Sequence, residues 1–285
     1  MPSLRDIRTR IGSVKNTRQI TNAMKMVSAA KLRKATSAAT NARPYQQALA
    51  ATLQRVAAKA GDVEHPLLSP RSTVKKVAAV VYSSDRGLCG GFNGSISRKT
   101  DELLKSWKAE GKEVIVWTNG KRIRDFLRAR GHNVVESRVD LKPTQFEDQT
   151  QAISVWLTEG FDRGDFDEAW LCFNQYKSTF SQIPTFIRVL PLAISGEGAS
   201  DAEYIYEPSA AEILGNLLPL YLRTLIFQSF LETEAGEHAA RMAAMDSATR
   251  NASDLIGRLT LEYNRSRQAA ITKELIEIIS GAEAL

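Results

Sequence analysis

The chain has 285 residues, of which 43% are hydrophobic and 25% are charged, a composition typical of a soluble globular protein with one or two domains. It contains no run of about 18 apolar residues and no apolar N-terminal segment, so the sequence predicts neither a membrane-spanning helix nor a secretory signal. The net charge of +6 is uneven: residues 1–43 hold ten basic residues and one acidic residue, which suits a solvated helix face, nucleic-acid contact or docking on an acidic protein surface.

Residues 1–60 are predicted to form one long amphipathic helix. Apolar or small side chains recur in alternating steps of three and four from Leu4 through Ile11 to Met24, which is the seam pattern of a coiled coil. Because this pattern begins at residue 4, no transit peptide is expected. Pro44 lacks an N–H group, so we expect it to kink or interrupt the helix near residues 42–43.

Residues 72–192 are predicted to form a central, Rossmann-like α/β domain, because strand and helix patterns alternate there. Such alternation favours a mostly parallel sheet, and two final strands joined by a polar turn predict an antiparallel addition at its edge. The predicted strands are 74–82, 113–117, 133–135, 168–176 and 183–190, and the predicted helices run to about 110 and over 121–130 and 143–157.

Residues 193–208 are predicted to be a linker, and residues 209–285 a second long helix. The start of this helix is indicated by Glu207, Pro208 and Ser209, with Glu212 three residues later.

The two long helices are predicted to pair as an antiparallel coiled coil, because their apolar positions match in one register when they are laid head to tail. The matched positions are Leu4 with Tyr263, Ile7 with Leu259, Ile11 with Ile256, Val14 with Ala252, and Thr21 with Met245. In this register residues beyond about 265 have no partner within the chain. Ile271, Leu275, Ile278 and Ile279 nevertheless continue an apolar stripe, which favours burial in another protein.

Few residues suggest catalysis or ligand binding. The segment 85–94, DRGLCGGFNG, follows a predicted strand and precedes a helix, where a phosphate-binding loop would lie. It lacks GK[ST], and Cys89 stands where GxGxxG requires glycine, so a tight structural turn is the favoured interpretation. The three histidines are widely separated and the two cysteines form no CxxC pair, so we expect no catalytic residue, cofactor site or metal site.

The sequence resembles the γ subunit of bacterial rotary (F-type) ATP synthases over essentially its whole length. The resemblance rests on DIRTRIGSVKNTRQITNAMKMVSAAKLRKA near the N-terminus, SSDRGLCGGFN in the centre, and EHAARMAAMDSATRNASDLI with LEYNRSRQAAITKELIEIISGAEAL at the C-terminus. It implies a non-catalytic rotor of the central stalk of a proton-translocating ATP synthase. Such a subunit couples rotation of the c-ring to conformational cycling of the catalytic β subunits.

The resemblance also implies the partners and the location. One copy per complex would lie within a hexamer of alternating α and β subunits and join the ε subunit and the c-ring, with no bound cofactor or nucleic acid. The complex would hold it peripherally at the cytoplasmic face of the bacterial inner membrane. The regulatory cysteine insertion of chloroplast γ subunits is absent from this sequence, so thiol control is not expected. The candidate partner contacts are Met24, Lys25, Met26, Arg241, Met242, Ile271, Leu275 and Ile278.

The first five of these residues are expected to converge in the predicted register as a mixed basic and apolar collar. Two other functions stay open on the residues alone. A basic coiled-coil protein that binds nucleic acid would show salt-sensitive DNA binding. A small-molecule-binding α/β enzyme would need a ligand at residues 86–94 and would be thermally stabilised by it.

Overall fold

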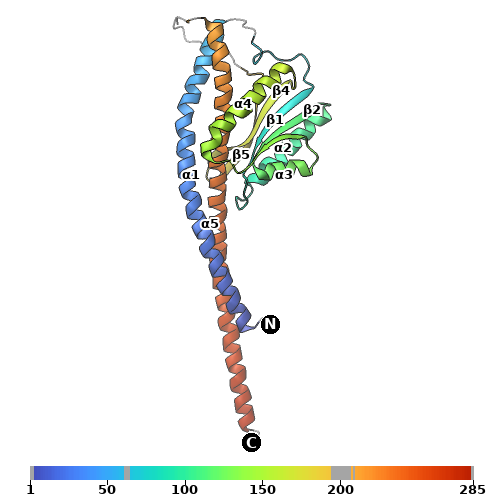
Figure 1. The fold of residues 1–285 in the computed structure, drawn as a ribbon. Coiled ribbons are helices and arrows are strands. Elements are labelled where there is room, and N and C mark those ends of the chain that lie inside the picture. The colour runs from blue at the N-terminus through green and yellow to red at the C-terminus, as the bar shows by residue number, and fades with distance from the viewer. Residues whose placement is uncertain (1–2, 61–64, 194–206, 208, 284–285) are drawn as a thin grey trace. The chain divides into compact units, whose positions relative to one another are not determined.

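The computed structural model describes residues 3–60, 65–193, 207 and 209–283. Its elements are shown in Figure 1. In chain order they are α1 (Leu4–Ala60), β1 (Lys76–Tyr82), α2 (Phe92–Ala109), β2 (Glu113–Asn119), α3 (Lys121–Ala129), β3 (Val134–Arg138), the short 3-10 helix η1 (Pro143–Gln145), α4 (Phe146–Arg163), β4 (Glu168–Ser178), β5 (Ser181–Leu190) and α5 (Ala210–Glu283). Most of the predicted linker 193–208 lies outside the described residues.

The chain divides into two compact units. The helical unit consists of Met1–Ala29 and Arg241–Leu285, and the α/β unit consists of Ala30–Ala240. Both long helices contribute residues to both units.

The α/β unit contains one five-stranded sheet with the strand order β3-β2-β1-β4-β5. Strand β1 pairs in parallel with β2 and β4, and β2 pairs in parallel with β3. Only β5 runs antiparallel, because a short turn joins it to β4, whereas each parallel pair is connected through a helix. The predicted fold class, with a mostly parallel sheet and an antiparallel edge, is confirmed.

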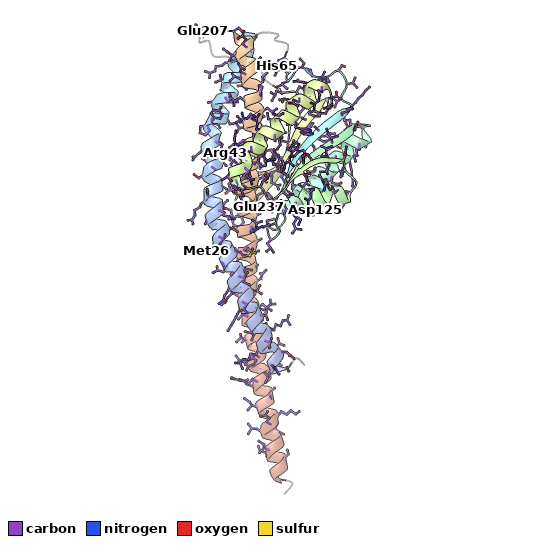
Figure 2. All side chains as sticks on the ribbon, viewed as in Figure 1. Met26, Arg43, His65, Asp125, Glu207 and Glu237 are labelled. Carbon is purple, nitrogen blue, oxygen red and sulfur yellow. The ribbon has the colours of Figure 1, made fainter. Side chains whose placement is uncertain are left out.

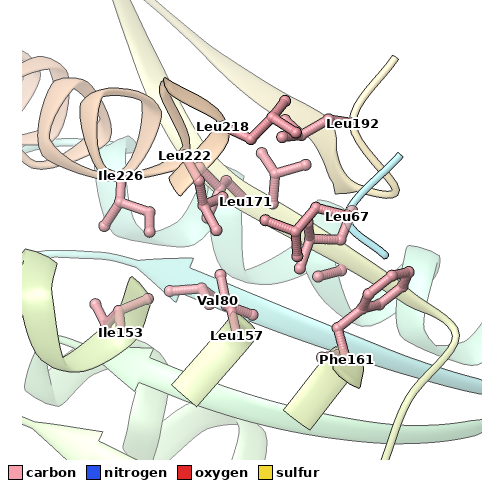
Figure 3. Packing of buried hydrophobic residues seen from close by; sticks show 14 of the residues in the cluster. Leu67, Val80, Ile153, Leu157, Phe161, Leu171, Leu192, Leu218, Leu222 and Ile226 are labelled. Atoms are coloured by element: carbon pink, nitrogen blue, oxygen red, sulfur yellow. The ribbon is translucent and has the colours of Figure 1, made fainter. Parts of the chain in front are cut away.

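Both faces of the sheet are covered, which explains why β1 is apolar throughout. Helices α2 and α3 cover one face and meet Val77, Ala79 and Val81 of β1. Helices α4 and α5 cover the other face and pack on Val80. Figure 3 shows part of the second core. Its labelled members are Leu67, Val80, Ile153, Leu157, Phe161, Leu171, Leu192, Leu218, Leu222 and Ile226.

Helix α5 enters this core through Leu214, Leu218, Leu222 and Ile226, which recur every four residues and are buried. By length and composition α5 could cross a membrane, since one 18-residue window reaches a mean hydropathy of 1.3. Leu214, Leu218, Leu222 and Ile226 are packed in the core of the α/β unit, and 22% of the residues in that window are buried.

Helix α1 runs without a break through Pro44. The predicted interruption near residues 42–43 therefore does not occur. Proline removes one N–H donor from the helix, but the seam of α1 is buried on both sides of it, at Ala39 and at Leu49. This packing holds the helix together across the missing hydrogen bond.

In the helical unit, α1 and α5 form the predicted antiparallel seam. Ile7, Thr21, Ala252 and Leu259 are buried, as the spacing predicts. The Thr249 hydroxyl donates a hydrogen bond to the Thr21 hydroxyl, at 2.8 Å between the oxygens, one turn along α5 from the predicted partner Met245. A seam residue of a coiled coil packs among four residues of the facing helix, so this bond is compatible with the predicted pairing of Thr21 with Met245, which stays a prediction.

Candidate partner-binding surface

The end of α5 in the helical unit exposes apolar side chains. Ile271, Leu275 and Ile278 are 49%, 53% and 68% exposed, and Ile276 and Ile279 are exposed beside them. At 100° per residue these five side chains span roughly 160° of the helix circumference. Figure 1 shows that α5 continues beyond the first turn of α1. The predicted stripe, which includes Ile279, is therefore exposed, and Ile276 widens it. That the stripe contacts a partner stays a prediction.

One residue of the predicted collar, Lys25, is paired with an acidic residue of α5. Lys25 forms an ion pair with Asp246, at 2.6 Å, and Arg250 approaches the other oxygen of Asp246 at 2.9 Å. The hydrogen bond from Lys25 lowers the pKa of Asp246, which burial tends to raise, and the charge of Arg250 lowers it further. The Lys25 ammonium group is thus held by α5 within the helical unit.

The remaining collar residues differ in exposure. Met26, labelled in Figure 2, is exposed, whereas Met24, Arg241 and Met242 are only partly exposed. Convergence of all five residues stays a prediction.

Two further exposed apolar residues on α1 were not predicted. Ile20 and Val27 are exposed and lie seven residues apart, hence on one face of the helix, with Met26 next to Val27. This second stripe lies outside the seam pattern, and its spacing of seven residues is the sequence signal that could have revealed it.

In the α/β unit, the glycine-rich loop 85–91 is closed by its own polar groups. The Ser84 hydroxyl donates to the carbonyl of Arg86 at 2.6 Å, and the Asn93 amide donates to the same carbonyl at 3.2 Å. The Asn93 amide oxygen accepts from the Ser84 backbone N–H at 3.0 Å. Leu88 is exposed with φ +62°, and Gly90 has φ +55°. These contacts support the interpretation of a tight structural turn.

The N-terminus of α3, a natural anion site, is occupied by side chains and backbone of residues 83–85. The Asp85 carboxylate accepts from the Lys121 N–H at 2.7 Å, and the Ser83 hydroxyl accepts from the Ile123 N–H at 3.0 Å. The free N–H groups and dipole of a helix start attract a phosphate, and here a carboxylate already satisfies them.

Side chains also fill the position at which open α/β sheets usually bind a ligand. In open α/β sheets ligands bind at the carboxyl ends of the strands where the strand order reverses, which here is between β1 and β4. Phe92, at the start of α2, lies so close to Gly236 of α5 that a Cβ at position 236 would be 2.9 Å from its ring. Cys89, Phe92 and Ala240 form a small apolar cluster there. This packing argues against a nucleotide at this position.

A buried cluster of charges lies between α2 and the end of α3. Both oxygens of Asp101 are used: His132 Nε2 lies 2.8 Å from one, and Arg130 and Lys105 lie 2.6 and 2.9 Å from the other. Burial raises the pKa of Asp101, but the hydrogen bonds from His132, Lys105 and Arg130 outweigh it and lower the pKa to about 2. Both oxygens of Asp101 are thus engaged within the fold, where they join α2 to the end of α3 and to His132. Within the described ranges no three His, Cys, Asp or Glu side chains gather to hold a metal ion.

Comparison with known proteins decides the family. A family profile described as ATP synthase matches residues 3–285. The ATP synthase gamma chain of Pelotomaculum thermopropionicum is 47% identical over 287 residues, and that of Hyphomonas neptunium is 48% identical over 294 residues. In both cases the match covers 100% of each chain. The chain belongs to the ATP synthase gamma chain family.

The likeness extends to a solved gamma-chain-like fold. A chain of the Euglena gracilis mitochondrial ATP synthase, from a structure of OSCP, F1 and the c-ring, matches 99% of this chain and 94% of its own length with a TM-score of 0.64. At 16% identity this likeness shows the fold alone. The predicted family is confirmed, and family membership makes the chain a subunit of ATP synthase.

Proposed function

We propose that this gamma-chain family member is the central-stalk rotor of a proton-translocating ATP synthase. It couples rotation of the c-ring to conformational cycling of the catalytic β subunits. The observation that carries the proposal is full-length similarity to curated gamma chains together with an exposed apolar end on α5. Neither a nucleic-acid-binding protein nor a small-molecule enzyme, the two alternatives from the sequence, is favoured by this family.

The proposal includes the division of labour along the chain. Residues 1–60 and 209–285 form the shaft, residues 72–192 the α/β domain, and residues 193–208 the linker. The ends of the shaft meet the hexamer of α and β subunits, and the α/β domain joins the ε subunit and the c-ring, with one copy per complex. Catalysis lies on the β subunits, and the complex holds the chain at the cytoplasmic face of the bacterial inner membrane.

A rotor of this kind acts through differential contact. A pair of unlike helices has no threefold symmetry, so it presents different side chains to each of three otherwise equivalent catalytic sites. A contact changes the conformation of a site only if it is stronger in one state than in another. On α1 the exposed residues Ile20, Met26 and Val27 offer apolar side chains, whereas Thr21 and Ser28 next to them are buried.

Covalent linking tests the proposal. A cysteine at Lys25 is linked to a neighbouring β subunit in the assembled complex, and ATP hydrolysis is measured before and after reduction. We expect hydrolysis to stop and then to return when the link is reduced. Full-rate hydrolysis with the link verified would show that rotation of this part of the shaft is not required.

An internal link is the control. The structure favours Thr21 and Thr249 over the Ile7–Leu259 pair of the predicted register, because their hydroxyl oxygens lie 2.8 Å apart. A disulfide between cysteines at these two positions ties the helices to each other and leaves the shaft free to turn. Hydrolysis is therefore expected to be retained.

A further inference from the structure

Glu232 of α5 is a carboxylate that is only 4% exposed and contacts three parts of the α/β unit. One oxygen accepts from the Arg43 guanidinium of α1 at 3.3 Å and from the Gln228 amide of α5 at 2.9 Å. The other oxygen accepts from the backbone N–H of Tyr176 in β4 at 2.9 Å. Arg43 is labelled on α1 in Figure 2.

These hydrogen bonds constrain geometry in a way that the surrounding core does not. Apolar contacts tolerate sliding of one element on another, whereas a buried carboxylate is stable only when its donors are in place. The proposed function does not by itself require a charged residue at this point of α5.

On α1, the Arg43 contact lies between the buried seam residues Ala39 and Leu49, in a stretch whose seam side chains are small or polar. Leu32 and Leu49 are buried large residues, but the seam positions between them are Ala35, Ala39, Ala42 and Gln46. Alanine buries little apolar area, and Pro44 removes a hydrogen bond from the same stretch. Arg43 therefore supplies an anchor that the seam lacks.

On β4, the contact replaces a missing neighbouring strand. Strand β1 pairs with β4 as far as Val81 opposite Cys172, and beyond this point β4 pairs only with β5. Tyr176 lies in this extension, opposite Gln182 of β5. Its N–H is bound by the Glu232 carboxylate, which thus attaches the projecting β4–β5 hairpin to α5.

We propose that Glu232 is a positioning residue that locks α1 and the β4–β5 hairpin to α5, so that torque entering through the α/β unit turns both long helices together. The proposal rests on the rotor function and names the residue that makes this part of the rotor rigid. Glu232 touches no reacting group, and its effect is on how elements move relative to one another.

The lock itself is tested on the isolated full-length chain by amide hydrogen exchange. Glu232→Gln keeps the side-chain shape but turns an NH2 group toward the donors. We expect exchange at residues 35–50 and 173–186 to become about tenfold faster, because local opening no longer breaks this hydrogen-bonded cluster. Unchanged exchange at both segments would overturn the proposal.

Two further variants separate a local effect from general destabilisation. Glu147→Gln removes an exposed ion pair of α4 with Arg223 of α5 and should leave both segments unchanged. Arg43→Gln removes only the α1 donor, so exchange should accelerate in residues 35–50 and not in the hairpin. If Glu232→Gln fails to fold, the Arg43→Gln variant alone tests the proposal. Faster amide exchange in both segments, or in neither segment, would then contradict it.

The coupling part is tested in the assembled complex in vesicles by the number of protons pumped per ATP hydrolysed. We expect Glu232→Gln and Arg43→Gln to lower this ratio at least about twofold while hydrolysis itself continues. An unchanged ratio together with faster exchange would make the cluster merely structural and overturn the positioning role. If instead the Lys25 link fails to stop hydrolysis, the rotor function fails while the exchange result stands.

Discussion

At the scale of single residues, a few side chains of the α/β unit each serve several partners. Asp85 accepts from the Lys121 N–H at the start of α3 and from the Asp140 N–H after β3. Asp167 accepts from the N–H groups of Lys75 and Lys76 at the start of β1. These carboxylates connect loops to the ends of strands and helices, so acidic residues in loops of this chain serve the fold.

Asp101 should make the free energy of unfolding depend on pH. Its pKa of about 2 lies below the ordinary value of 3.8, so its contribution is present above about pH 4 and is lost as the pH falls toward 2. We expect the free energy of unfolding of the parent chain, relative to Asp101→Asn, to fall by about 2 kcal/mol over this interval, measured by urea denaturation. Glu102→Gln, which removes an exposed pair with Lys99, is the control. A difference that did not change with pH would refute this role.

Gly120 should tolerate no side chain. It has φ +112°, and a Cβ there would lie 2.3 Å from the Ser83 carbonyl oxygen. We expect Gly120→Ala to lower the free energy of unfolding by about 3 kcal/mol or more, measured by urea denaturation. Gly111→Ala also requires positive φ but meets nothing within 4 Å, so it should lose only about 1 kcal/mol. Equal losses would show that the close approach to Ser83 is unimportant.

At the scale of elements, the long helices combine two kinds of surface. One side carries the seam, and the C-terminal part of α5 in the helical unit carries apolar side chains with no cover among the described residues. Three polar contacts, Thr21 with Thr249 and Asp246 with Lys25 and Arg250, accompany the seam. The seam is thus not purely apolar, and polar pairs help to define which turn of α5 faces which turn of α1.

The exposed end of α5 should matter for assembly and not for folding. Replacing Ile271, Leu275 and Ile278 together with serine removes apolar area that is already in contact with water, so the melting temperature of the isolated chain should stay unchanged. Binding to the hexamer of α and β subunits should weaken at least about a hundredfold, measured by titration of the reconstituted complex.

The matched control for that experiment replaces Thr272, Lys273 and Glu274 with serine, at exposed positions of the same turns. This variant should bind the hexamer within a few fold of the parent chain. A loss of melting temperature in the apolar triple variant would place those side chains in the fold and not at an interface.

At the scale of the whole molecule, an α/β sheet of nucleotide-binding type is used without a nucleotide site. The start of α3 is capped by Asp85, and Phe92 on Gly236 fills the position where the strand order reverses. We therefore expect the purified chain neither to hydrolyse ATP nor to bind it with micromolar affinity in calorimetry. Micromolar binding that disappears in Gly90→Ala or Gly91→Ala would contradict this prediction.

The sequence by itself determined the element types, the order of strands and helices along the chain, and the buried face of each long helix. These features depend on periodicity, which is a local property: two for a strand and near 3.5 for a seam helix. The predicted stripe at Ile271, Leu275 and Ile278 followed from the same periodicity, and the structure exposes it. The family could also be predicted, because long motifs match along the whole chain.

Only the tertiary structure decided which distant residues meet. Thr249 hydrogen-bonds Thr21, a polar pair across the seam that apolar spacing does not reveal. Helix α1 continues through Pro44 because its seam is packed on both sides. Glu232 looks in the sequence like any solvated acidic residue, and its role appears only when Arg43, 189 residues away, and the free edge of β4 are brought to it. Long-range polar contacts carry no local period, so spacing along the chain cannot reveal them.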